Sequence, residues 1–351
     1  MKKKFSATVL TVLLGMSCLS GCGAPDEISN EPVKNQKEVQ NQSNAVEETE
    51  TNEQAEKPTI ICTIFPEYDW ICEILGEKKE EYEVKLLLEN GVDIHSYQPT
   101  AKDIAEISDC DLFVYTGGVS ESWIEETLES AINENMQVLE LMEVLGERAK
   151  TEEIVEGMEH DHTEECDHPD EETSYDEHIW LSLKNASVLV ESLEQALISF
   201  DEKNAAVFRE NADTYAVQLE ELDMKYQAAV ESAANKTVLF GDRFPFRYLT
   251  DDYGLEYYAA FTGCSAETEA SFETITFLAG KLEELQLPAV LVIENSDQKL
   301  AETIINSTKE RNAEILVMNS LQSVKREDIE AGVSYISVME ENLEVLKAAL
   351  G

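Results

Sequence analysis

Short apolar runs alternate with helical stretches along this chain, and the pattern occurs twice. Runs rich in isoleucine, leucine and valine that are separated by helices are typical of a largely parallel sheet with helices on both faces. The expected strands lie at residues 58–65, 82–88, 110–118 and 137–141, and again at 236–242, 255–261, 288–295 and 313–319. The pattern therefore predicts an α/β protein with two lobes.

A long helical region separates the two sets of strands. Its apolar residues recur at alternating spacings of four and three, which places them on one stripe of a helix: Phe208, Ala212, Tyr215, Leu219, Leu222, Tyr226 and Ala229. We expect a stiff connecting helix at 201–234, on the order of 40 Å long, between an N-terminal lobe at 58–200 and a C-terminal lobe at 235–351. The alternative is a coiled-coil dimerisation helix. The mixed alanine and tyrosine seam favours packing on the chain's own lobes, and hence a monomer.

The N-terminus predicts export. A basic start at residues 2–4 precedes an apolar run that is too short for a normal membrane span. The letters "LSGC" at residues 19–22 are similar to a bacterial lipobox, so we expect a signal peptide at 1–21 and a lipid on Cys22. The alternative is an ordinary cleaved signal with an incidental cysteine. Residues 22–57 are polar and acidic, as in a disordered tether, so the folded part is expected outside the cytoplasm, lipid-anchored to the bacterial cell membrane.

The net charge restricts the kinds of partner that the protein can bind, and the number of cysteines bears on whether it forms disulfides. The formal net charge is −47, from 73 acidic and 26 basic residues, which argues against nucleic acid as a partner. Leaving aside Cys18 in the signal and Cys22, the chain contains an odd number of cysteines: Cys62, Cys72, Cys110, Cys166 and Cys264. One or two disulfides are compatible with this number outside the cytoplasm, but the spacing identifies no pairs.

Two histidines lie where a ligand is expected. His95 follows the second strand and a glycine turn, two residues after Asp93, and ligands bind at the carboxyl ends of strands in open α/β sheets. Imidazole and carboxylate are common donors to zinc or manganese. His178 follows two acids and precedes "IWL", where Trp180 can pack and fix the backbone. The alternatives are a surface histidine at 95 and a helix-start histidine at 178.

Four segments together resemble one family: "TIFPEYDWICEILG", "GVDIHSYQPTAKDIAEISDCDLFVYTGG", "DEHIWLSLKNA" and "SYISVMEENLEVLKAAL". They are similar to the solute-binding lipoproteins of zinc and manganese ABC importers. The resemblance implies two lobes that are joined by a rigid helix, with one metal ion between them and an importer permease in the cytoplasmic membrane as partner. It matches His95 and His178 to the two metal histidines of the N-terminal lobe, and Asp93 to a ligand of some members.

The acidic stretch at about 150–175 resembles the histidine-rich loop of zinc-specific members. Its candidate donors are His160, His162, Cys166 and His168. Mobile histidine and carboxylate groups give weak, exchangeable coordination, so such a loop would collect zinc for the main site. The alternative is a solvated acidic insert whose histidines have no role.

The C-terminal lobe departs from the family pattern. Where zinc members have a third histidine this chain has Gly241, and no histidine follows His178. We expect the neighbouring Asp242 to replace it. The alternative is an ion pair of Asp242 with Arg243 or Arg247. Other candidates, ranked lower, occupy the same lobe: Asn319, Glu269, Glu273, Glu294 and the soft donor Cys264.

These features predict a zinc-binding protein rather than an enzyme. Manganese is the alternative cargo, because two histidines with carboxylates make a harder site than three histidines. A zinc-dependent hydrolase is the alternative from another class, although the chain contains no HExxH motif. An adhesin role, which the resemblance also allows, is not addressed by the residues.

Overall fold

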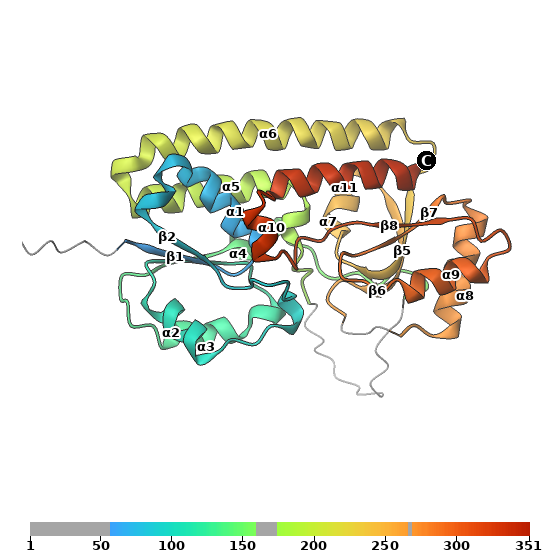
Figure 1. Cartoon of the computed structure of the whole chain (residues 1–351), viewed down its shortest axis with the longest axis horizontal. Helices are drawn as coiled ribbons and strands as arrows, with labels where there is room; N and C mark the ends of the chain where they lie inside the picture. Colours follow the sequence, from blue (N-terminus) through green and yellow to red (C-terminus); the bar gives the residue numbers. More distant parts are fainter. Residues whose placement is uncertain (1–56, 159–173, 266–268) are drawn as a thin grey trace, which may run out of the picture. The chain divides into compact units, whose positions relative to one another are not determined.

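The computed structural model describes residues 57–158, 174–265 and 269–351, which belong to one compact unit. Two four-stranded sheets lie in this unit, with strand orders β2-β1-β3-β4 and β6-β5-β7-β8 (Figure 1). Every pairing between neighbouring strands is parallel. The predicted α/β fold with two mainly parallel sheets is confirmed.

The first sheet is built from residues that precede the two long helices at residues 183–200 and 205–232. Its strands are β1 (Thr59–Cys62), β2 (Glu83–Leu86), β3 (Leu112–Tyr115) and β4 (Gln137–Glu140). One face packs against α1 (Phe65–Leu75), α4 (Leu141–Leu145) and α5 (Leu183–Phe200), and the other against α2 (Ala101–Asp109) and α3 (Trp123–Glu129). Successive side chains of a strand point to opposite faces, so Ile60 and Ile61 belong to different core clusters. Burial on both faces explains why the two central strands, β1 and β3, are apolar along nearly their whole length.

The second sheet repeats this arrangement after the central helices. Its strands are β5 (Thr237–Phe244), β6 (Glu256–Thr262), β7 (Ala289–Val292) and β8 (Glu314–Val317). One face packs against α8 (Phe272–Glu284) and α9 (Lys299–Ser307), and the other against α7 (Arg247–Tyr253) and α11 (Tyr335–Leu350). The pairing of β5 with β6 shifts register between Phe240 and Arg243.

Several shorter elements complete the described chain. The helix α10 (Arg326–Glu330) precedes α11, and 3-10 turns lie at Gly76–Glu81, Ile94–Ser96, Val119–Glu121, Gly146–Arg148, Ile179–Leu181 and Glu202–Asn204. Thr100 caps α2 as expected, since its side chain accepts a hydrogen bond from the Asp103 N–H. None of the helices in the described residues is long and apolar enough to cross a membrane.

The connecting helix is α6 (Ala205–Ser232), whose 28 residues span about 42 Å. It packs against α1 and α5 at one end and against α11 towards the other (Figure 1). All but the last of the seven predicted stripe residues are buried, and Val230 takes the last buried position in place of Ala229. The helix therefore uses its apolar face within its own chain.

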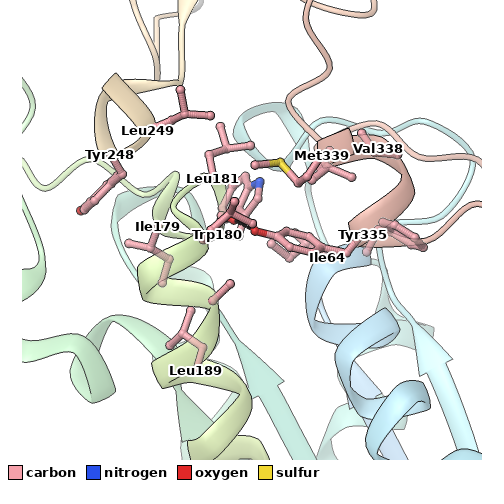
Figure 2. Close-up of a cluster of buried hydrophobic side chains, with 14 of the residues drawn as sticks. Ile64, Ile179, Trp180, Leu181, Leu189, Tyr248, Leu249, Tyr335, Val338 and Met339 are labelled. Atoms are coloured by element: carbon pink, nitrogen blue, oxygen red, sulfur yellow. Dashed lines mark hydrogen bonds between the residues drawn. The ribbon is translucent and has the colours of Figure 1, made fainter. Parts of the chain in front are cut away.

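A buried cluster joins the residues after His178 to the start of α11. Figure 2 shows the Tyr335 ring pointing towards Trp180. The Tyr335 hydroxyl donates to the Trp180 carbonyl oxygen at 2.6 Å, and Trp180 Nε1 donates to the Ser320 carbonyl oxygen at 2.9 Å. Trp180 is fully buried, as the sequence predicts, so these bonds fix the backbone that carries His178.

The four described cysteines, Cys62, Cys72, Cys110 and Cys264, have free thiols. No disulfide therefore joins them, and Cys166 lies outside the described residues. The signal peptide, Cys22 and the tether also lie outside the described residues.

Candidate metal site

His95 and His178 lie face to face although 83 positions separate them in the chain. Their Nε2 atoms are 3.0 Å apart, and their ring centroids are 5.0 Å apart. Each belongs to a 3-10 turn or its cap: Ile94–Ser96 contains His95, and His178 caps Ile179–Leu181. The structure thus brings together the two histidines that the sequence analysis singles out.

Asp176 fixes the orientation of His178. Its Oδ1 accepts from the backbone N–H of His178 at 2.9 Å and lies 2.8 Å from Nδ1 of the ring. A carboxylate is an acceptor, so Nδ1 carries a hydrogen, and Nε2 is the ring atom that faces His95. Both side chains are buried, which keeps this hydrogen bond away from water.

His95 is held by a different set of groups. Its Nδ1 lies 2.8 Å from the Ser120 hydroxyl and 3.6 Å from Oε2 of Glu177, while Asp93 accepts from its backbone N–H at 3.0 Å. Burial, followed by the proximity of His178, lowers the pKa of His95 to about 3. The ring is therefore neutral at physiological pH, and a neutral imidazole is the form that binds metals.

The third member of this group is Cys264, at the end of β6. Among the described residues, the ligand atoms of His95, His178 and Cys264 all lie within 4.8 Å of one another. Burial raises the pKa of the Cys264 thiol, and the charges of Glu177 and Glu152 raise it further. Two imidazoles from the first lobe and one thiol from the second thus meet at one point.

Asp93 forms an ion pair that connects the two lobes. Its Oδ2 accepts from Nη2 of Arg243 at 2.6 Å, and both side chains are 19% exposed. Burial alone would raise the pKa of Asp93, but Arg243 and His95 outweigh it and lower the pKa. The Asp93 carboxylate is therefore already neutralised beside the histidines, and it is outside the group of three.

The position of Asp242 differs from what a metal ligand requires. One carboxylate oxygen accepts from the Arg243 N–H at 2.8 Å, and the other accepts from the Ile293 N–H at 3.4 Å. A side chain added at Gly241 would collide with Ala301 and Val290 at 2.9 Å, so that position faces α9 and not the histidines. Arg243, two residues further along β5, instead reaches Asp93 beside the histidines. The ligand role of Asp242 stays a prediction, and this geometry does not favour it.

Most of the lower-ranked candidates of the second lobe are hydrogen-bonded to other groups or exposed on the surface. Both carboxylate oxygens of Glu294 accept from Ser320, at 2.8 and 2.9 Å. The Asn319 amide oxygen accepts from the Leu321 N–H at 2.8 Å. Glu269 and Glu273 are exposed. Of the candidates named from the sequence, Cys264 is the second-lobe residue that the structure places against the histidines.

Comparison with known proteins agrees with this architecture. Residues 60–349 match the family described as "Zinc-uptake complex component A periplasmic". The chain belongs to this family. The zinc-binding lipoprotein AdcA of Streptococcus pneumoniae is 32% identical over 291 residues, which cover 83% of this chain and 55% of AdcA. The chain thus spans about half the length of this relative.

Two further relatives cover more of their own length. The high-affinity zinc uptake system protein ZnuA of Bacillus subtilis is 28% identical over 296 residues, or 84% of this chain and 88% of that protein. The crystal structure of the Zn(II)-bound ZnuA-like domain of S. pneumoniae AdcA has a TM-score of 0.65 and 29% identity, and covers 84% of this chain and 99% of that domain. The match to the zinc-uptake family therefore extends over the whole fold.

The donors assigned to the acidic loop, His160, His162, Cys166 and His168, lie outside the described residues. The described residues on either side are joined by an antiparallel bridge between Thr151 and Tyr175, and Asp176 N donates to the Lys150 carbonyl oxygen at 2.8 Å. The described residues that flank this segment, Thr151 and Tyr175, therefore lie together beside Asp176.

The sequence analysis missed the residues that orient the two rings. Asp176 stands two residues before His178, as Asp93 stands two residues before His95, and in both pairs the aspartate accepts from the histidine N–H. This repeated Asp-x-His spacing is a readable signal, because aspartate commonly bonds to the backbone two residues on. No comparable signal marks Ser120, which reaches His95 from a separate turn.

Proposed function

We propose that this protein binds zinc between its two lobes outside the cytoplasm and delivers it to an ABC permease. The observation that carries this proposal is the pair of oriented imidazoles of His95 and His178, whose Nε2 atoms are 3.0 Å apart. Two zinc–nitrogen bonds of about 2.0–2.1 Å at a tetrahedral angle place the nitrogens about 3.3 Å apart. The rings need to separate by only a few tenths of an ångström to hold the ion.

The names of the relatives support zinc over manganese as cargo. AdcA is named a zinc-binding lipoprotein, and ZnuA of B. subtilis a high-affinity zinc uptake protein. Imidazole donors also suit zinc better than manganese, which favours carboxylate, carbonyl and water ligands. Membership of an uptake family sets aside the hydrolase alternative, whereas the adhesin role stays a prediction.

The anchor and the partner follow from the same assignment. We propose that Cys22 carries the lipid, that the chain acts as a monomer, and that the importer permease receives the ion. The lipobox-like "LSGC" supports the anchor, and AdcA is named a lipoprotein. The four loop donors are proposed to bind zinc weakly and to supply it to the main site.

Titration of the full-length chain with zinc, in competition with a chelator of known affinity, tests the proposal. His95→Ala and His178→Ala should each weaken the tightest site by orders of magnitude. His168→Ala is the matched control, since it removes an imidazole of the loop and should leave the tightest site unchanged while lowering the total zinc bound. Tight binding that survives both site substitutions would refute the assignment.

A further inference from the structure

We propose that Cys264 is the zinc ligand contributed by the second lobe, and that its thiolate takes the place of a third histidine. This inference rests on the proposed function, because it names the donor that completes the same site. It predicts a site with two nitrogen donors and one sulfur donor. Such a site selects zinc over manganese by the softness of its ligand as well as by its shape.

The distances fit this donor set. A zinc–sulfur bond of about 2.3 Å and a zinc–nitrogen bond of about 2.0–2.1 Å at a tetrahedral angle place sulfur about 3.6 Å from each nitrogen. The three ligand atoms of His95, His178 and Cys264 already lie within 4.8 Å of one another. Small side-chain rotations therefore suffice to bring all three to bonding distance.

The residue before Cys264 allows the turn to approach the histidine. A Cβ at Gly263 would lie 2.8 Å from Cε1 and 3.0 Å from Nδ1 of His178, and 2.9 Å from the Phe244 carbonyl oxygen. Those contacts are closer than real Cβ atoms tolerate, so only glycine permits this backbone path. The turn that delivers the thiol is thus built against the ring of His178.

Hydrogen bonds then hold the backbone of Cys264 in place. Its N–H donates to Oε1 of Glu152 at 3.2 Å, and the next residue closes the turn through the Ser265 N–H to the Thr262 carbonyl oxygen at 3.3 Å. Glu152 belongs to the segment that leads into the acidic loop. Cys264 is therefore positioned by contacts from both lobes.

The two aspartate candidates, Asp93 and Asp242, have other partners. Asp93 is paired with Arg243, and both oxygens of Asp242 accept from backbone N–H groups. Recruiting either carboxylate would break these bonds, whereas Cys264 can turn to the ion without losing an ion pair. A thiolate also supplies negative charge that neutral imidazoles lack.

Cobalt substitution gives a direct readout of the sulfur ligand, because thiolate coordination produces a charge-transfer band in the near ultraviolet. The full-length chain and the control Cys166→Ser, which removes the cysteine of the acidic loop, should both show the band. Cys264→Ser should lose it, with zinc affinity weakened by more than the 10–100-fold that is typical when an outer partner of a ligand is removed. Its preference for zinc over manganese should fall as well.

The outcomes separate this inference from the proposed function. If the unmodified chain does not bind zinc tightly, the proposed function fails. If it binds tightly and needs His178 but retains the cobalt band in Cys264→Ser, only the role of Cys264 is refuted. Should that variant not fold, alkylation of the unmodified chain decides, with mass spectrometry to map each cysteine. Zinc must protect Cys264 from alkylation, and equal modification with and without zinc overturns the proposal.

Discussion

Replacing Asp176 by asparagine tests whether the orientation of His178 contributes to metal affinity. The substitution keeps the size of the side chain, and an amide oxygen can still accept from the His178 N–H groups. It removes the negative charge that now lies 2.8 Å from Nδ1 and favours a more basic ring. Loss of such a partner typically costs 10–100-fold in metal affinity, so we expect zinc binding to weaken by about 1.4–2.7 kcal/mol.

Competition with a chelator measures this loss, and thermal unfolding in the presence of chelator shows whether the fold is intact. Ser120→Ala is the matched control, because it removes a neutral hydroxyl that lies 2.8 Å from Nδ1 of the other ring, His95. Hydrogen bonds to neutral groups are weaker than those to charged groups, so this loss should stay below about tenfold. A well-folded Asp176→Asn variant with unchanged zinc affinity would refute the role assigned to the carboxylate.

Two further predictions concern the stability of the fold. Burial raises the pKa of Asp69 from 3.8 to about 7, although the hydrogen bond from the Tyr335 N–H to its carboxylate opposes this change. The folded state therefore holds the Asp69 proton more tightly than the unfolded state. The free energy of unfolding consequently falls as pH rises from about 4 to about 7. Urea unfolding across this pH range measures the effect. In Asp69→Asn the free energy of unfolding should fall by up to about 4 kcal/mol less than in the unmodified chain. If both chains lose the same stability over this range, Asp69 is not the group that titrates. Tyr335→Phe leaves the buried Trp180 carbonyl without its donor and should cost about 1–3 kcal/mol. The half-exposed Tyr175→Phe should change stability by less than about 0.5 kcal/mol, and equal effects would refute the role of the buried hydroxyl.

The apolar pattern was sufficient to predict the fold. Each expected strand has a counterpart within a few residues, because parallel strands that are buried on both faces must be apolar along their whole length. The stripe along α6 was equally readable, since its buried residues follow helical spacing. The short helices α4 and α7 were missed, as their few turns give too little periodicity to recognise.

Only part of the site could be predicted from the sequence, because spacing along the chain does not show which side chains of β5 face the histidines. The sequence identifies His95, which follows a strand and a glycine turn, and His178, which follows two acids and precedes an apolar segment. It does not show that β5 shifts register between Phe240 and Arg243. Nor does it show that Gly241 faces α9 or that Arg243 reaches Asp93. The sequence therefore favoured Asp242, which neighbours the position of the missing third histidine. In the structure, the turn after β6 brings Cys264 to the histidines.

The charges around the site give a reason for an arginine to stand so close to a cation-binding group. In a chain of net charge −47, additional carboxylates would hold any divalent cation without discrimination. Arg243 neutralises Asp93 and so removes a hard oxygen donor from beside the imidazoles. The remaining donors are two imidazole rings and, on our proposal, one thiolate, which favour zinc over the harder cations. Arg243 and Cys264 thus have the same effect on selectivity, because each makes the site less suited to manganese.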